Sequence, residues 1–227
     1  MAKIIVLMGA PGAGKGTQAR LLQERLNLPQ ISTGDMFRAL AESDTPLAQE
    51  VRETQAAGKL IPDDLVIRVV QERTRRDDCK RGYVLDGFPR TTAQANMLEK
   101  LAAEQEKHII AIVVEVPSDL LEKRALGRRT CPLCGELYNM YFKPPLNDER
   151  CDLHPEARLI QRLDDTTEKI KVRLATYEEQ TRPLIEYYQS SGRLYRVDGT
   201  QGPEAIFQEI EKIISGNDLA PQGLFGR

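Results

Sequence analysis

The chain has 227 residues, 41% of them hydrophobic, which is enough to bury the core of one α/β domain and excludes a disordered chain. Its 32 basic and 34 acidic residues leave a net charge of −2, so the composition gives no support for wholesale binding to nucleic acid or to an anionic membrane. The five-residue apolar run that follows Lys3 is too short for the hydrophobic region of a signal peptide or for a membrane span, and we therefore expect a cytoplasmic protein.

Apolar runs and helical patterns alternate along the chain. The runs that predict buried parallel strands are Lys3–Met8, the weaker Leu28–Ile31, Gly82–Leu85, Ile109–Val116 and Leu194–Val197. Helices are expected from the glycine-rich loop to Leu26, then over Asp35–Glu42, Pro46–Ala57, from Asp63 onward, Thr91–Gln105, Ser118–Leu126, Thr166–Ser190 and Pro203–Ile214. This alternation predicts an α/β fold in which helices flank a five-stranded parallel sheet.

The stretch "GAPGAGKGT", Gly9–Thr17, joins the first strand to the first helix and matches the phosphate-loop (P-loop) motif. Its glycines allow backbone N–H groups to turn toward phosphates, and Lys15 supplies a positive charge between the outer phosphates. Gly16 stands where the motif has Ser or Thr, so we expect Thr17, one residue later, to belong to the magnesium shell. A plain glycine-rich turn is the alternative interpretation, and the strand-to-helix context disfavours it.

Two segments interrupt the alternation, Ser32–Ile61 and Gly127–Asp165. The second has nearly forty residues of weak periodicity, and a compact domain needs something to order so long a stretch. We therefore expect a core domain made of residues 1–31, 62–126 and 166–227, with residues 32–61 and 127–165 as smaller domains.

A single carboxylate ends the third predicted strand, in "GYVLDGFPR". Asp86 stands where a second acidic site for magnesium is expected, because parallel sheets place ligands at the carboxyl ends of their strands. Taken alone, an aspartate in this position is more often a turn or cap residue. The P-loop in the same chain favours the magnesium role.

Three of the four cysteines gather in a 24-residue window, Cys131–His154. Cys131, Cys134, Cys151 and His154 follow C-x₂-C-x₁₆-C-x₂-H, the ligand spacing of a tetrahedral zinc site. Four protein ligands leave no open position for water, so the pattern favours a structural ion over a catalytic one. Iron would also bind such a set, and coincidental clustering is the remaining alternative.

Six motifs occur together in the order and approximate spacing of adenylate kinases: "GAPGAGKGTQA", "QISTGDMFR", "AGKLIPDDLV", "LDGFPRT", "LGRR" and "VDGT". The chain resembles this family from about residue 3 to about residue 214. The resemblance implies a P-loop NTPase fold in which residues 32–61 form an AMP-binding insertion and residues 127–165 a zinc-containing lid over ATP. It implies reversible, Mg²⁺-dependent conversion of ATP and AMP to two ADP, in nucleotide biosynthesis and purine salvage, by a monomer.

The resemblance also assigns residues to the two nucleotides. The AMP side would comprise Thr33, Arg38, Lys59, Leu60, Ile61, Gly87, Phe88, Pro89, Arg90 and Gln94, with Arg38 on the phosphate and Gln94 on the adenine edge. The ATP side would comprise Gly12, Ala13, Gly14, Lys15, Gly16 and Thr17 around the phosphates, Arg124 against the adenine, and Leu137, Tyr138 and Gln201, the last through its main chain.

Arginines carry most of the expected catalysis. By the same resemblance, Arg128, Arg162 and Arg173 would converge on the transferring phosphoryl group, together with Lys15, Arg38 and Arg90. Arginine suits this task because it is planar, permanently charged and able to bind phosphate through two N–H groups. No general base is required, since the AMP phosphate is already an anionic nucleophile at neutral pH.

Two other functions are compatible with parts of the pattern. A UMP or CMP kinase would share the P-loop, but those relatives usually have a short lid and a small residue in place of Thr33. A non-enzymatic ATP-binding zinc module would not need the AMP-site motifs, and the near-neutral charge and 5% aromatic content give it no nucleic-acid surface.

Overall fold

The computed structural model describes residues 2–56 and 60–216. The strands are β1 (Lys3–Met8), β2 (Gln30–Ser32), β3 (Gly82–Asp86), β4 (His108–Glu115), β5 (Arg128–Thr130), β6 (Leu137–Asn139) and β7 (Leu194–Asp198). The α-helices are α1 (Lys15–Leu26), α2 (Thr33–Ala41), α3 (Pro46–Ala56), α4 (Asp63–Thr74), α5 (Thr92–Glu104), α6 (Ser118–Gly127), α7 (Thr167–Thr176), α8 (Pro183–Ser190) and α9 (Pro203–Gly216). A short 3₁₀ turn covers Asp77–Cys79. Among residues 2–56 and 60–216, none of the helices combines the length and the apolar character that a membrane span requires.

Five strands form one parallel sheet in the order β2-β3-β1-β4-β7, which confirms the predicted fold class. The central strand β1 is buried along its whole length, as its unbroken apolar run predicts. Because all five strands run the same way, their carboxyl ends meet at one edge of the sheet. That edge is where ligands bind in folds of this type.

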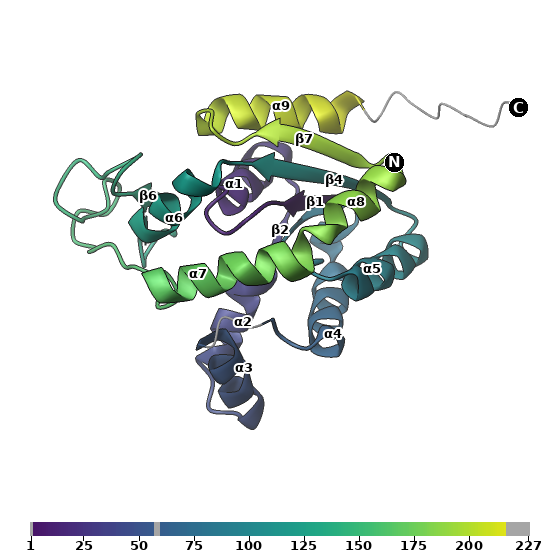
Figure 1. Ribbon diagram of the computed structural model, residues 1–227, viewed down its shortest axis with the longest axis horizontal. Helices are drawn as coiled ribbons and strands as arrows, with labels where there is room; N and C mark the ends of the chain where they lie inside the picture. Colours follow the sequence, from purple (N-terminus) through teal and green to yellow (C-terminus); the bar gives the residue numbers. More distant parts are fainter. Residues whose placement is uncertain (1, 57–59, 217–227) are drawn as a thin grey trace, which may run out of the picture.

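Helices cover both faces of the sheet (Figure 1). Helices α1 and α9 pack on one face through an apolar cluster that includes Ile5, Leu22 and Ile210. Helices α4, α5 and α8 pack on the other face, where Ile4 and Leu98 are fully buried. The sheet is therefore held rigidly from both sides, and the loops at its carboxyl edge are fixed relative to one another.

Two parts extend from this core, in the segments where the alternation of the sequence breaks. Helices α2 and α3 project together on one side, and the segment after α6, which holds β5 and β6, projects on another (Figure 1). Strands β5 and β6 pair antiparallel, with Arg129 opposite Tyr138, and were not expected from the sequence. This segment has a buried cluster of its own, separate from the two that flank the sheet, made of Cys131, Tyr138, Cys151, Ala157 and Leu159.

The single helix expected over Thr166–Ser190 is interrupted. A π-helical turn, Tyr177–Thr181, separates α7 from α8. Pro183 explains the break, because it has no backbone N–H and its ring clashes with the carbonyl four residues earlier. The Arg182 N–H instead donates to the Tyr177 carbonyl oxygen, five residues back, at 2.8 Å.

The contact between the first residues of β1 and β3 generates a stability prediction. Gly82 has φ +127°, and a Cβ added there would lie 2.5 Å from the Lys3 carbonyl oxygen. We expect Gly82→Ala to lower the free energy of unfolding by about 2–4 kcal/mol, measured by urea denaturation. The matched control is Gly192→Ala, which also has positive φ (+68°) but open space around it and should lose only about 1 kcal/mol. Equal losses in the two variants would contradict the backbone clash.

Candidate active site

The P-loop lies between the end of β1 and the start of α1, at the carboxyl edge of the sheet. Lys15 curls back over the loop, and its Nζ donates hydrogen bonds to the carbonyl oxygens of Gly9 (2.7 Å) and Ala10 (3.0 Å). Burial lowers the pKa of Lys15 to about 8; Asp86 opposes this shift, and nearby arginines add to it. The two carbonyl oxygens and Asp86 thus only partly offset the cost of burying the lysine charge, and an added anion would stabilise it further.

The start of α1 is open to an anion. Gly14 is the N-cap in a left-handed conformation, no side chain caps the helix, and its first turn holds no acidic residue. Gly12 has φ +88°, and a Cβ there would lie 2.5 Å from the Leu121 carbonyl oxygen, so the loop packs directly on the backbone of α6. An uncapped helix N-terminus in a rigid loop is a ready site for phosphate.

Asp86 lies beside this loop. It ends β3, in register with Leu7 of β1 and Ser32 of β2. A Cβ added at Gly16 would lie 3.4 Å from Asp86 Oδ2, so the missing side chain at position 16 leaves room beside the carboxylate. The departure from the usual motif at Gly16 thus coincides with the close approach of an acidic residue.

A fully buried carboxylate organises two of the predicted arginines. Asp165 accepts two hydrogen bonds from Arg128, from Nε at 2.8 Å and from Nη2 at 2.6 Å. Arg173 Nη1 lies 3.0 Å from the same carboxylate and 3.1 Å from Asp164 Oδ2. Because two arginines share one carboxylate and each is about one-fifth exposed, both keep capacity to bind a further anion.

Arg38 and Arg162 come from the two projecting segments and meet at Asp35. Arg38 forms an ion pair with Asp35, and Arg162 Nη2 lies 3.6 Å from Asp35 Oδ1. Burial, followed by the charges of Arg128 and Arg38, lowers the pKa of Arg162 to about 10. The projecting segments therefore meet across the carboxyl edge of the sheet through charged groups.

Arg90 completes the cationic group, and it forms no hydrogen bond or ion pair with a carboxylate of residues 2–56 and 60–216. Its Nε donates to the Gly87 carbonyl oxygen at 2.8 Å. Burial lowers its pKa, and the charge of Arg173 lowers it further. For Asp164, burial raises the pKa, but the surrounding arginines outweigh this effect and the net shift is downward. The Asp164 shift, which runs against the effect of burial, reports the positive potential of the surrounding arginines.

The residues expected on the AMP side lie together, with one outside the described residues. Thr33 Oγ1 donates to the Gly87 carbonyl oxygen at 2.9 Å, and a Cβ at Gly87 would lie 3.0 Å from both Thr33 Oγ1 and Arg90 Nη2. Phe88 and Pro89 are buried, Ile61 belongs to the core cluster, and Leu60 is half-buried. Gln94 is buried and bonded to Asp63 and to the Arg90 backbone. Lys59 lies outside the described residues.

On the opposite side, Arg124 lies between the core and the segment after α6. Its Nη1 donates to the Gly199 carbonyl oxygen at 2.8 Å, and its guanidinium carbon lies 5.5 Å from the centre of the Phe142 ring. Leu137 is half-buried, and Gln201 is exposed. Arg124 is therefore hydrogen-bonded to the core backbone at its edge and lies near an aromatic ring of the projecting segment.

The side chain of Tyr138 points into the segment after α6. Its side chain is 4% exposed and lies inside the cluster around the cysteines, where its hydroxyl accepts a hydrogen bond from the Asp152 N–H at 2.9 Å. The hydroxyl also lies 3.5 Å from Cys151 Sγ. The ring of Tyr138 therefore faces the cysteine cluster, and its backbone is the part of the residue that remains to contact a ligand.

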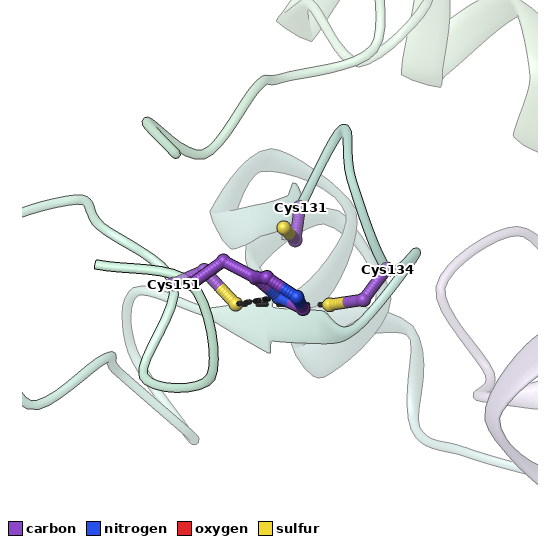
Figure 2. A group of neighbouring side chains, drawn as sticks. Cys131, Cys134 and Cys151 are labelled. Atoms are coloured by element: carbon purple, nitrogen blue, oxygen red, sulfur yellow. Dashed lines mark hydrogen bonds between the residues drawn. The ribbon is translucent and has the colours of Figure 1, made fainter. Parts of the chain in front are cut away.

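The four predicted metal ligands come together. The ligand atoms of Cys131, Cys134, Cys151 and His154 all lie within 4.8 Å of one another. Figure 2 shows the three labelled cysteines directing their sulfurs toward a common centre. The Cys134 and Cys151 sulfurs are 3.7 Å apart, and two thiolates bound tetrahedrally to zinc are about 3.8 Å apart.

The surroundings of Cys151 favour the thiolate that a metal binds. Burial raises its pKa, but hydrogen bonds from the Tyr138 hydroxyl, His154 and the Leu153 backbone outweigh that effect, and the net pKa is about 6. The distances within the cluster fit a tetrahedral metal ion, whereas the pKa of Cys134 is raised, so the lowered pKa describes Cys151 and not the whole set.

Sequence analysis missed the acidic residues that hold the arginines in place. Asp35, Asp164 and Asp165 accept the ion pairs described above, and Asp63 binds Gln94. The doublet Asp164–Asp165 begins two residues after Arg162 in "QRLDD". This closeness of opposite charges was the one feature of the sequence that could have indicated ion pairs in this segment. Sequence spacing alone does not show which acid a given arginine will bind.

Most of the chain is similar in sequence to known adenylate kinases. The sequence model of the family described as Adenylate kinase matches residues 7–193. The adenylate kinase of Clostridium perfringens (strain SM101 / Type A) is 48% identical over 215 residues, covering 94% of this chain and 99% of that protein. Adenylate kinases of Thermodesulfovibrio yellowstonii (46%) and Oceanobacillus iheyensis (45%) match over 211 residues, covering 92% of this chain and 98% of each relative.

The shared carboxylate generates a stability prediction for the protein without ligands. Asp165→Asn should lower the free energy of unfolding in urea by about 2–3 kcal/mol, because it leaves Arg128 and Arg173 without their common anion. We expect less than the full cost of breaking a buried pair, since each arginine is 21% exposed. Asp148→Asn, an exposed acid of the same segment, is the control and should change stability by less than about 0.5 kcal/mol. Equal stability of the two variants would refute this role for Asp165.

Proposed function

The chain belongs to the adenylate kinase family, and on that premise we propose that it transfers a phosphoryl group reversibly between ATP and AMP to form two ADP. One observation carries the proposal. Six cations from separate elements lie close enough at one edge of the sheet for their charges to add to the effect of burial and lower the pKa values of Lys15, Arg90 and Arg162. They are Lys15, Arg38, Arg90, Arg128, Arg162 and Arg173. Two bound nucleotides present a dense group of phosphates, and this arrangement of cations suits them.

Positioning and charge stabilisation account for the chemistry. A phosphoryl group in transfer passes through a loose transition state with charge on its equatorial oxygens, so catalysis needs donors already aimed at those oxygens. Lys15 and the uncapped start of α1 would hold the ATP phosphates, while Arg128 and Arg173, preoriented by Asp165, would contact the transferring group. No side chain has to remove a proton, since the attacking AMP phosphate is already an anion.

Magnesium accompanies ATP in this family, and the residues present fit it. Asp86 is the carboxylate nearest Gly16 of the P-loop, and Thr17 supplies a hydroxyl on the first turn of α1. We propose that these two residues hold Mg²⁺, directly or through water. When bound, the ion neutralises part of the charge on the phosphates.

The two nucleotides would bind on opposite sides of the cationic group. Thr33, Gly87 and Gln94 would receive AMP, with Arg38 and Arg90 on its phosphate. Arg124 and the backbone of Leu137 and Tyr138 would lie along the ATP base, together with the main chain at Gln201. In this arrangement AMP and ATP meet end to end between Arg90 and Arg128.

We propose the domain division on the same grounds, with residues 32–61 over AMP and residues 127–165 as a lid over ATP. Contacts across these boundaries support a closing motion. Arg162 of the lid segment approaches Asp35, and Arg20 of α1 donates to the Gly135 carbonyl oxygen and pairs with Glu136, both at 3.0 Å. Closure would exclude water, which otherwise competes with AMP for the phosphoryl group.

A metal ion bound by the four ligand residues would stabilise the fold of the lid and would take no part in the reaction. The buried core of this segment consists of a few residues around the cysteines, so packing alone provides little folding energy. Zinc fits the ligand set, and its binding contributes about 10–16 kcal/mol in zinc-finger peptides at neutral pH. We therefore propose a structural Zn²⁺ held by Cys131, Cys134, Cys151 and His154.

The direct test of the function is ADP formation from ATP by the purified protein. We expect turnover with AMP as acceptor and at most slow turnover with UMP or CMP. Faster reaction with a pyrimidine nucleotide would assign the protein to the UMP/CMP class. ATP binding with no ADP formed from any acceptor would support the non-enzymatic module instead.

Arg90→Ala should lower kcat toward the 10³-fold end of the range known for a transition-state arginine. Arg90 is the suitable position because it donates to a carbonyl oxygen, and its removal leaves no carboxylate without a partner. Arg158→Ala is the control, since Arg158 is exposed and pairs with Glu149 at the lid surface. A folded Arg90→Ala protein with unchanged kcat would contradict the role of Arg90.

Removing a metal ligand should affect stability more than chemistry. Cys131→Ser should abolish stoichiometric metal binding and lower the melting temperature, while most activity near 25 °C remains. Cys79→Ala, a buried cysteine outside the cluster, should retain one equivalent of metal. Metal analysis and calorimetry measure both effects, and a fully folded, metal-free Cys131→Ser protein without activity would overturn the structural role.

A further inference from the structure

The side-chain amide of Gln94 is held at both ends by the protein. Its Nε2 donates to Asp63 Oδ1 at 2.6 Å, and its Oε1 accepts from the Arg90 backbone N–H at 2.7 Å. The side chain is 2% exposed. The amide therefore sits in an enclosed place at the start of α5, next to the residues proposed to receive AMP.

The two partners fix which end of the amide is oxygen and which is nitrogen. A carboxylate can only accept a hydrogen bond, so it must face the NH₂ group, and a backbone N–H can only donate, so it must face the oxygen. Turning the amide by half a turn would place Oε1 against the Asp63 carboxylate and the NH₂ group against the Arg90 N–H. Both hydrogen bonds would be lost together and replaced by repulsion.

Each end of the amide keeps one further hydrogen-bonding position. An NH₂ group has two donors and a carbonyl oxygen has two lone pairs, and one of each is used here. A ligand base at this place thus meets one donor and one acceptor in a fixed order. Adenine offers the complement, with an acceptor at N1 and a donor in its 6-amino group, whereas a 6-oxopurine offers a donor at N1 and an acceptor at O6.

We propose that Asp63 is a specificity-determining residue that orients Gln94 to accept adenine and to reject 6-oxopurines at the monophosphate site. The inference rests on the proposed function, because it takes the base of AMP to lie at Gln94. Asp63 acts as a positioning residue through Gln94. Thr91 steadies it, since Thr91 Oγ1 donates to Asp63 Oδ2 at 3.2 Å and accepts from the Gln94 N–H at 3.1 Å.

A purely structural role for Asp63 makes a different prediction. Asp63 and Asp64 both stand in the first turn of α4, where a negative charge favours the helix. Asp64 faces solvent and lies 3.6 Å from Arg68, so Asp64→Asn removes the same charge from the same turn without touching Gln94. A helix-dipole effect would appear equally in both variants, while an effect on base choice would appear only at Asp63.

The test compares AMP with inosine monophosphate (IMP), its 6-oxo counterpart, as acceptors for ATP. Sites that hydrogen-bond a substrate group reject the analogue that lacks it by up to about 10⁴–10⁵, so the wild-type kcat/KM ratio should exceed about 10³. In Asp63→Asn, whose own amide can serve either orientation, we expect the ratio to fall about tenfold. The KM for AMP should rise several-fold and the KM for ATP should stay within about twofold.

Binding measured by calorimetry with the wild-type protein gives a second readout that needs no variant. The 6-unsubstituted purine ribonucleotide keeps the N1 acceptor and loses only the donor, so the affinities should fall in the order AMP, purine ribonucleotide, IMP. An IMP affinity equal to that of the purine ribonucleotide would overturn the proposal. So would an AMP-to-IMP ratio that is unchanged in Asp63→Asn, or one that falls equally in Asp64→Asn.

These outcomes are separable from failure of the function itself. If the wild-type protein forms ADP from ATP and AMP but Asp63→Asn leaves the ratio unchanged, the inference about Asp63 fails and the kinase function stands. If the wild-type protein neither binds AMP nor forms ADP, the proposed function fails and the inference fails with it.

Discussion

The structure depends on holding several cations close together at the carboxyl edge of one sheet. Like charges repel, and burial removes the water that would screen them, as the lowered pKa values of Lys15 and Arg162 show. Asp165 makes the arrangement possible by binding two arginines in the interior, and Asp35 does the same where the two projecting segments meet. Enough positive charge remains unmatched that phosphate is the natural counterpart. The same features therefore limit the stability of the empty protein and create its affinity for nucleotides.

Much of the fold could be predicted because the relevant signals are local. The five apolar residues Ile4–Met8 are rich in β-branched side chains and are followed by a glycine loop, which together predict a buried strand. Glycines at fixed intervals before Lys15 identify the loop that follows. The π turn before Pro183 could not be predicted, since a proline inside a helical pattern can end, bend or bulge the helix and tertiary packing decides among these outcomes. Strands β5 and β6 are only three residues each, too short for any periodicity.

Some residues of the candidate site could likewise be predicted from the sequence, and others could not. Ligand spacing identified the four candidate metal ligands because tetrahedral coordination restricts both the residue types and the intervals between them. The roles of acidic partners such as Asp63 and Asp165 could not be predicted from the sequence. A carboxylate in the first turn of a helix or in a charged loop can serve several purposes, and only its neighbours in space show which one applies. The orientation of the Tyr138 side chain could not be predicted from the sequence either. A three-residue strand has two faces, and only the cysteine cluster determines that this ring points inward.

The π turn between α7 and α8 has a consequence for how this protein can change over time. Helix α8 is anchored in the core by Leu184 and Tyr188, whereas α7 carries Arg173 to the shared carboxylate. The extra residue in the turn sets the rotational phase between the two, and each residue of an α-helix corresponds to about 100°. No residue of Tyr177–Thr181 is fully buried, and only Tyr177 packs against an apolar cluster, beside Ala13 and Leu121, so the other side chains of the turn can vary. A single insertion or deletion, by contrast, would turn Arg173 to another side of the helix, so this surface tolerates changes of composition but not of length.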